Sequence, residues 1–283
     1  MRILITGASG QLGHELVRVL RGHDLVLADL PTFDLLKPET ERFICDAHPE
    51  LVIHTAAYTD VDGAEREPAL AMTVNAEGTE LVAKAAASIG ARLIAISTDY
   101  VFDGRSNVPY DEQDDPSPLG VYGRSKYEGE RLALRSCPNT LIVRTSWLYG
   151  LRGKNFVKTI MHLAAERPEL RVVADQRGSP THAGDLAEAL ARLTMVPLRG
   201  VAHATGADDC TWYEFASEIV TLMGLAVPVQ PITTAEARRA APRPAYAVLK
   251  NRVLAGVGIT LPHWKDALER FIKSAQTAPL IAS

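Results

Sequence analysis

The chain begins with Ile3-Leu4-Ile5-Thr6-Gly7-Ala8-Ser9-Gly10-Gln11-Leu12-Gly13, a short apolar run that leads into a turn with three glycines. The apolar run predicts a buried strand, and the amphipathic stretch Gln11–Arg21 after the turn predicts a helix. In such a unit Gly7 permits the tight turn, Gly10 lets the backbone approach a diphosphate, and Gly13 allows close helix packing. The stretch therefore predicts a dinucleotide-binding turn, although its Gly-x-x-Gly-x-x-Gly spacing is looser than the Gly-x-Gly-x-x-Gly form.

Apolar runs bounded by Gly, Asp or Pro alternate with amphipathic stretches over residues 1–147, which is typical of βαβ units around a parallel sheet. We expect strands at Arg2–Thr6, Leu25–Ala28, Leu51–His54, Arg92–Ser97, Leu141–Thr145 and Val201–Ala204. We expect helices at Gln11–Arg21, Pro38–Ala47, Ala64–Glu67 extending towards Val74, Thr79–Ile89 and Val121–Arg135. The predicted fold class is α/β, a Rossmann-type doubly wound parallel sheet with a smaller C-terminal α/β substrate lobe.

Prolines divide the chain into shorter segments after Trp147, so this region is expected to form the smaller lobe. Gly184–Leu193 and Val201–Ala204 are expected to return to the main sheet. The predicted dinucleotide-binding domain therefore comprises residues 1–147 and about 181–206, and the predicted substrate-binding lobe comprises about 148–180 and 207–283.

Composition excludes several classes of function. The formal net charge of −4 and the isoelectric point near 6.1 give no basic footprint for nucleic acid. No apolar run approaches the length of a membrane span, and Met1-Arg2 leads directly into a strand, so we expect no leader, no membrane contact and a cytoplasmic location. Cys45, Cys137 and Cys210 form no Cys-x-x-Cys pair, so neither disulfides nor a metal site is expected.

Residues that follow the predicted strands are candidates for the rest of a cofactor site. Asp29 ends the second strand, where a carboxylate would accept hydrogen bonds from the adenosine ribose and repel a 2′-phosphate, which favours NADH. Lys37 could help to bind a 2′-phosphate, so the use of NADPH stays open. Asp34-Leu35 could flank the adenine, and Ala56-Ala57 are small enough to let a cofactor pass. Asn75 is either a helix N-cap or a residue that holds structure near the nicotinamide.

Tyr122 and Lys126 form a Tyr-x-x-x-Lys pair on a predicted helix, so their side chains share one face. The Lys126 ammonium is expected to favour the ionised form of the phenol and so lower its pKa. Thr98 follows a predicted strand and could add a hydroxyl to the group. Together with a bound hydride carrier, an acid at Tyr122 would reduce a carbonyl group.

These features resemble the extended short-chain dehydrogenase/reductases and, more narrowly, the dTDP-4-dehydrorhamnose reductases, over nearly the whole chain. The stretches that carry the resemblance are Gly10–Gly13, Ala56–Glu65, Ser97–Phe102, Arg144–Gly150, Asn155-Phe156, Asp175–Thr181, Thr211–Ala216 and Arg243-Pro244.

The resemblance implies an oxidoreductase that uses NADH or NADPH to reduce the 4-keto group of dTDP-4-dehydro-L-rhamnose, a dTDP-4-dehydro-6-deoxy-L-sugar, to dTDP-L-rhamnose. It makes Tyr122 the acid, Lys126 the ligand of the nicotinamide ribose and Thr98 a donor to the keto oxygen. The implied cofactor-binding residues are Gly7, Gly10, Gln11, Leu12, Gly13, Asp29, Asp34, Leu35, Ala56, Ala57, Tyr58, Asn75, Tyr122 and Lys126. The implied substrate-binding residues are Thr98, Asp99, Trp147, Asn155, Gln176 and Arg243. A homodimer is one expected assembly.

One segment departs from the family pattern. Where Arg-Pro-x-x-Ser-x-Leu is usual, the chain has Ala247 in place of the hydroxyl residue, with Tyr246 beside it. The exact deoxysugar and nucleotide base therefore stay open. Two further alternatives are a nucleotide-sugar dehydratase or epimerase, disfavoured because Asp99-Tyr100 lacks the glutamate that a dehydratase carries after its aspartate, and a non-catalytic dinucleotide-binding subunit.

Overall fold

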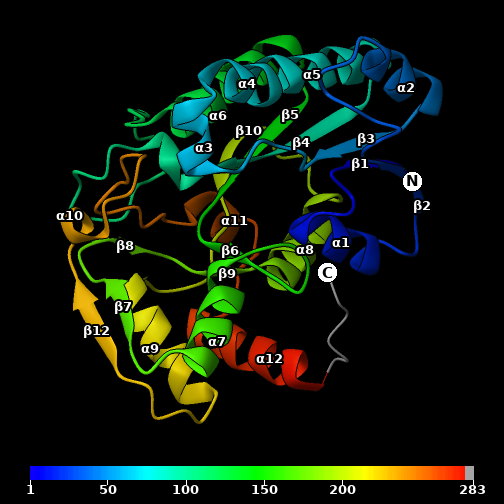
Figure 1. The fold of residues 1–283 in the computed structure, drawn as a ribbon. Coiled ribbons are helices and arrows are strands. Elements are labelled where there is room, and N and C mark those ends of the chain that lie inside the picture. The colour runs from blue at the N-terminus through cyan, green and yellow to red at the C-terminus, as the bar shows by residue number, and fades with distance from the viewer. Residues whose placement is uncertain (278–283) are drawn as a thin grey trace.

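A six-stranded parallel sheet lies at the centre of the computed structural model, which describes residues 1–277 (Figure 1). The strands follow the spatial order β10-β5-β4-β3-β1-β2 and all neighbours pair in parallel. Their bounds are β1 Arg2–Thr6, β2 Asp24–Ala28, β3 Leu51–His54, β4 Arg92–Thr98, β5 Thr140–Thr145 and β10 Gly200–His203. The expected doubly wound α/β class is confirmed by this order, since β2 lies on one side of β1 and β3 on the other.

Helices cover both faces of this sheet (Figure 1). One face carries α2 (Glu39–Ala47), α5 (Gly78–Ser88) and α6 (Val121–Ser136); the other carries α1 (Gln11–Val19) and α8 (Ala183–Leu193). The connections between strands hold the shorter elements α3 (Val61–Arg66), α4 (Pro68–Met72), the π-helical turn η1 (Thr73–Glu77) and the 3-10 turn η2 (Asp99–Val101).

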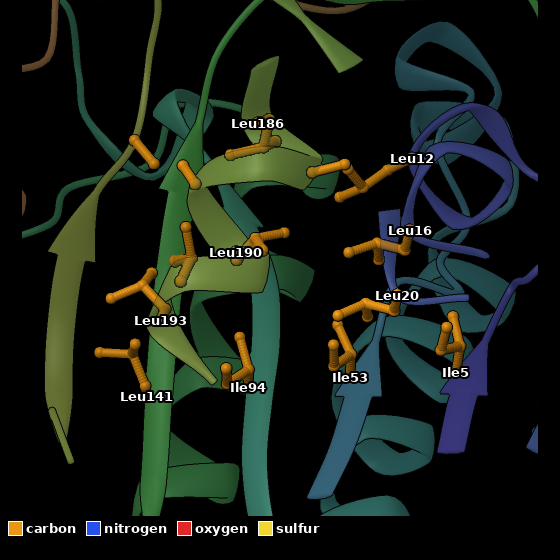
Figure 2. Close-up of a cluster of buried hydrophobic side chains, with 14 of the residues drawn as sticks. Ile5, Leu12, Leu16, Leu20, Ile53, Ile94, Leu141, Leu186, Leu190 and Leu193 are labelled. Atoms are coloured by element: carbon orange, nitrogen blue, oxygen red, sulfur yellow. The ribbon is translucent and has the colours of Figure 1, made fainter. Parts of the chain in front are cut away.

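Side chains of the strands alternate between the two layers, which is why these short apolar runs form buried strands. On β1, Ile3 and Ile5 face α1 and α8, whereas Leu4 faces the α2, α5 and α6 layer. Figure 2 shows the first layer, in which Leu12 and Leu16 of α1 pack with Leu186, Leu190 and Leu193 of α8 above the sheet.

A separate apolar cluster lies outside the main sheet, around Tyr149, Phe215 and Phe271. It is built from three short strand pairs and several helices (Figure 1). The strands are β6 Leu148–Tyr149 with β9 Thr181–His182, β7 Leu170–Val173 with β12 Val229–Ile232, and β8 Arg177–Gly178 with β11 Cys210–Thr211. The helices of this cluster are α7 Phe156–Glu166, α9 Trp212–Leu222 and α12 Trp264–Thr277. The short helix α10 Thr234–Ala237 lies beside β7, whereas α11 Arg252–Gly256 contacts β10 and packs with the main sheet.

The expected elements of residues 1–147 occur in the structure, with bounds that differ by few residues. The largest difference follows Tyr58, where one expected helix is divided into α3, α4 and η1 because Pro68 starts a new helix. Val201–Ala204 was expected to return to the main sheet, and β10 pairs there with β5. The proposed boundaries of the two domains stay a prediction. Among residues 1–277, no helix has the length and apolar character needed to cross a membrane.

Candidate functional site

The glycine turn lies at the carboxyl end of β1, next to the carboxyl end of β3, where the winding of the sheet reverses. This is the crevice in which open α/β sheets bind ligands. Gly7 has φ +68°, and a Cβ there would lie 2.8 Å from the Ala56 backbone nitrogen; a Cβ at Gly13 would collide with the Gly7 carbonyl. No described side chain caps α1, so its first amides can bind an anion. These features fit a dinucleotide diphosphate.

Asp29 connects the end of β2 to the glycine turn. Its Oδ2 accepts hydrogen bonds from the Ser9 backbone N–H at 2.7 Å and the Ser9 hydroxyl at 2.5 Å, and its Oδ1 accepts one from the Leu30 N–H at 2.9 Å. Burial opposes the charge, but the bonds from Ser9 and Leu30 outweigh it and lower the pKa of Asp29. Asp29 is therefore an ionised acceptor beside the turn, where a ribose would need one.

Of the other residues expected around the adenosine half, one is buried in the core and the others contact neighbouring parts of the chain. Leu12 is buried in the core and points towards α8, so it can offer a cofactor only its backbone (Figure 2). Leu35 packs near Gly78, and Asp34 accepts a bond from the Leu36 N–H at 3.0 Å. The Gln11 side chain accepts a hydrogen bond from Asn155 at 3.0 Å, which joins α1 to the start of α7.

Asn75 lies within the π-helical turn η1 and is not an N-cap, so that expectation was wrong. Its amide oxygen accepts from the Tyr58 N–H at 2.9 Å, and its amide nitrogen donates to the Tyr58 carbonyl and the Ser125 hydroxyl, each at 3.0 Å. Ser125 in turn donates to the Tyr122 carbonyl at 2.8 Å. Asn75 therefore fastens the segment that follows Ala56-Ala57 to the helix that carries Tyr122.

Helix α6 places Tyr122 and Lys126 on one face, as their spacing predicted. The Glu65 carboxylate accepts a hydrogen bond from the Val121 N–H at 2.7 Å and so caps the start of the helix. Lys126 is buried, and its ammonium donates to the Ile96 carbonyl of β4 at 2.8 Å. The helix is thereby anchored at its start by Glu65 and at β4 by Lys126.

Thr98 and Asp99 lie where β4 ends and η2 begins. The Thr98 hydroxyl donates to Asp99 Oδ1 at 2.9 Å and accepts from the Tyr100 N–H at 3.2 Å. Asp99 Oδ2 is buried and has no hydrogen-bond partner among the described residues. Burial raises the pKa of Asp99 to about 7.

The Tyr122 phenol has a raised pKa, contrary to the expected lowering by Lys126. Burial is the main cause, and a side-chain hydrogen bond with Thr98 opposes it only in part. Burial also lowers the pKa of Lys126 to about 8. Tyr122 therefore remains protonated near neutral pH, which is the state that a proton donor requires.

Arg243 comes from a segment near the end of the chain and reaches Asp62, which lies in α3. It donates to the two carboxylate oxygens of Asp62 at 3.1 and 3.0 Å, and its charge acts on Tyr100 by opposing the rise in the pKa of that phenol. Burial, followed by the charge of Asp99, raises the pKa of Tyr100 to about 12. Arg243 is thus connected through Tyr100 to Asp99 and Tyr122.

The remaining expected substrate residues lie farther along the chain. Trp147 has φ +47° and stacks on Trp212, with ring centroids 3.4 Å apart. Asn155 caps α7 through the Lys158 N–H at 3.0 Å, and Gln176 donates to the Thr234 hydroxyl at 2.9 Å. The structure therefore gives these residues structural contacts, and their roles towards a substrate stay predictions.

A family model described as the RmlD substrate binding domain matches residues 1–277 of this chain. The chain belongs to this family. Its relatives in the family include the dTDP-4-dehydrorhamnose reductase of Mycobacterium tuberculosis, 43% identical over 94% of this chain and 91% of the relative. A probable dTDP-4,6-dihydroxy-2-methyloxan-3-one 4-ketoreductase of Streptomyces antibioticus is 42% identical over 95% of this chain and 93% of the relative.

A solved structure agrees with this membership of the RmlD substrate binding domain family. The dTDP-4-dehydrorhamnose reductase of Bacillus anthracis in complex with NADP matches with a TM-score of 0.94 and 41% identity, covering 96% of this chain and 99% of that chain. The resemblance to the reductase family inferred from the sequence is therefore confirmed.

Three residues of this RmlD-family site were not among the residues singled out from the sequence. Ser9 holds Asp29, Asp62 holds Arg243, and Tyr100 contacts Tyr122. Each acts through another side chain that is distant in sequence, so no local spacing indicates it. Within residues 1–277, no group of three or more His, Cys, Asp or Glu side chains is placed to hold a metal ion.

Proposed function

We propose that the chain uses NADH or NADPH to reduce the 4-keto group of a dTDP-4-dehydro-6-deoxy-L-sugar, with dTDP-4-dehydro-L-rhamnose as the first candidate and dTDP-L-rhamnose as its product. The observation that carries this proposal is that the Thr98 hydroxyl lies close enough to the Tyr122 phenol to influence its pKa, near the carboxyl end of the sheet that holds the glycine turn. Relatives named dTDP-4-dehydrorhamnose reductase support the choice of substrate.

The coenzyme, when bound, supplies the hydride. Gly7, Gly10 and Gly13 would let its diphosphate approach the start of α1, and Asp29 would accept bonds from its adenosine ribose. Tyr122 would donate its phenolic proton to the keto oxygen, while Thr98 would donate a hydrogen bond to the same oxygen. The Lys126 ammonium, one helical turn from Tyr122 on the same face of α6, would bind the nicotinamide ribose and stabilise the phenolate that remains.

Asp29 and the family relatives point to different coenzymes. A carboxylate at this position disfavours a 2′-phosphate, which supports NADH. The Bacillus anthracis reductase is in complex with NADP, which supports NADPH. We propose that the chain accepts NADH and that NADPH is the alternative.

An assay with dTDP-4-dehydro-L-rhamnose and each coenzyme tests the proposal, followed by NMR of the product to determine its configuration at C4. We expect one coenzyme oxidised for each sugar reduced, and dTDP-L-rhamnose as the product. Oxidation with no sugar product, or a C4 epimer of dTDP-L-rhamnose, would contradict the assignment of the substrate.

A second candidate is a reductase for another nucleotide 4-keto-deoxysugar. Ala247, where the family has a hydroxyl residue, and the Streptomyces antibioticus relative named as a different 4-ketoreductase favour it. Turnover of another 4-keto-deoxysugar, with none of the rhamnose precursor, would select this candidate. Coenzyme binding without turnover of any such sugar would select a non-catalytic subunit.

We also propose that residues 1–147 and about 181–206 bind the coenzyme, and that the predicted lobe of about 148–180 and 207–283, of which 278–283 lie outside the described residues, binds the substrate. The glycine turn and Asp29 support the first part, and the separate apolar cluster around Tyr149 and Phe215 supports the second. A cytoplasmic location and a homodimer stay predictions, which cell fractionation and analytical ultracentrifugation test.

A further inference from the structure

Glu130 continues the line of Tyr122 and Lys126 along α6, since the three residues follow one another at intervals of four and share one face of the helix. Glu130 is buried and forms a two-point ion pair with Arg144 of β5. The guanidinium donates from Nε to Oε1 at 2.9 Å and from its terminal nitrogen to Oε2 at 2.6 Å. Both side chains are 3% exposed. The carboxylate is therefore fixed in place below Lys126.

A small cavity lies between this ion pair and Lys126. Its volume is about 10 Å³, which is close to the room that one water molecule needs. The Ser97 hydroxyl lines it and is buried without a hydrogen-bond partner among the described residues. The cavity is lined by Thr79, Ala95, Ile96, Ser97, Lys126, Gly129, Glu130 and Ile142. Lys126 and Glu130 thus line a common small cavity.

The charges around Lys126 come from three elements. Burial lowers the pKa of Lys126 to about 8, and the charge of Glu130 opposes this effect. From β3, His54 contributes no charge near neutral pH, because burial and then the charge of Lys126 lower its pKa to about 3. From β5, Arg144 is paired with Glu130 through two hydrogen bonds, and the effect of Glu130 on Lys126 is still to raise its pKa. Glu130 is therefore the anion available to compensate the buried ammonium.

We propose that Glu130, fixed by Arg144, is a positioning residue that keeps Lys126 charged beneath Tyr122. The carboxylate acts across the cavity and does not touch the reacting atoms. Its importance for catalysis rests on the proposed reductase function, but its effect on the charge of Lys126 does not. The two can therefore be tested separately.

The direct test is a titration of Lys126 in the full chain without coenzyme, with isotope-labelled lysine followed by NMR at Cε. A Lys126→Met variant assigns the resonance. In Glu130→Gln we expect the titration midpoint of Lys126 to fall by about one pH unit or more, because an opposite charge has been removed from a buried site. An unchanged midpoint would overturn the proposal.

A double variant keeps the test valid if Glu130→Gln fails to fold, and a control variant tests whether the effect is specific. Glu130→Gln leaves the buried Arg144 without a charged partner, whereas the double variant Glu130→Gln with Arg144→Gln leaves no unpaired guanidinium beside β5. We expect a lowered midpoint in the double variant also. Asp185→Asn is the matched control, because it removes the carboxylate partner of Arg270 in another part of the fold. A midpoint that falls equally in this control would contradict the proposal.

Activity provides the second measurement. If the reductase function holds, the alkaline fall of kcat in Glu130→Gln moves to lower pH, and Glu130→Asp, which retains the charge, restores most of the wild-type profile. A shifted titration in a protein that reduces no 4-keto sugar would refute the function and leave the role of Glu130 intact. A shifted pH profile with an unshifted titration would refute the role of Glu130 alone.

Discussion

The rings of Tyr100 and Tyr122 meet edge to face, with centroids 5.5 Å apart and planes inclined by 76°. The charge of Arg243 acts on Tyr100, and Arg243 is held in turn by Asp62. The segment that holds Arg243, late in the chain, thus supports through Tyr100 the phenol of Tyr122 on α6, which lies in the first half of the chain. Because the support passes through packed groups, it can set the position of the Tyr122 hydroxyl without touching a substrate.

Arg243→Met should lower kcat about 10- to 100-fold, because loss of the guanidinium that interacts with Tyr100 lets the ring beside Tyr122 move. The affinity for coenzyme should stay unchanged, since the glycine turn lies elsewhere. Steady-state kinetics and coenzyme titration check both statements. The control is Arg238→Met, which changes an exposed arginine of the same segment. An unchanged kcat in Arg243→Met would show that this support is not needed.

Asp29→Asn should raise the affinity for NADPH relative to NADH by about tenfold, because it removes the negative charge that opposes a 2′-phosphate. Fluorescence titration with both coenzymes measures the ratio. Asp24→Asn, at the opposite end of the same strand, should leave the ratio as in the wild type. If both variants keep the wild-type ratio, Asp29 does not determine the choice of coenzyme.

Gly7→Ala should reduce the free energy of unfolding by about 1–3 kcal/mol and weaken coenzyme binding. The added Cβ would meet the Ala56 nitrogen at 2.8 Å and force φ away from +68°. Gly90→Ala is a matched control, since Gly90 has φ +72° but open space around the new atom. Urea unfolding compares the two, and equal losses would argue against the close approach of Gly7 to Ala56.

Asp99→Asn should stabilise the fold at alkaline pH. Because burial raises the pKa of Asp99 to about 7, above its value in the unfolded chain, the contribution of this group is greatest below about pH 4 and is lost as pH rises through 7. The variant should gain about 3–5 kcal/mol relative to the wild type between pH 4 and pH 8. Urea unfolding at both values measures this, and a pH-independent difference would contradict the raised pKa.

Local patterns in the sequence predicted the main sheet well, because each of its strands is a short apolar run whose residues alternate between two buried layers. The spacing of Tyr122 and Lys126 likewise placed both on one helical face. Contacts such as Asp62 with Arg243 join segments far apart in the chain, so periodicity could not predict them. The pKa of Tyr122 was expected to fall and instead rises, because burial depends on the packing of the whole site.

The spacing of Glu130 from Lys126 is the same as that of Lys126 from Tyr122, so the helical period alone places Glu130 on the face of the helix that carries both. Its partner Arg144 could be identified only once β5 had been placed beside α6. The small strand pairs of the second apolar cluster are two to four residues long, which is too short for a period to be recognised.

Single-turnover reduction of dTDP-4-dehydro-L-rhamnose by the wild type and by Tyr122→Phe tests the central claim most directly. The substitution keeps the aromatic ring and removes only the hydroxyl that would donate the proton. We predict a rate about 10²- to 10⁴-fold lower in the variant, with the dissociation constant for the coenzyme unchanged. A Tyr122→Phe enzyme that reduces the sugar at the wild-type rate would contradict the account.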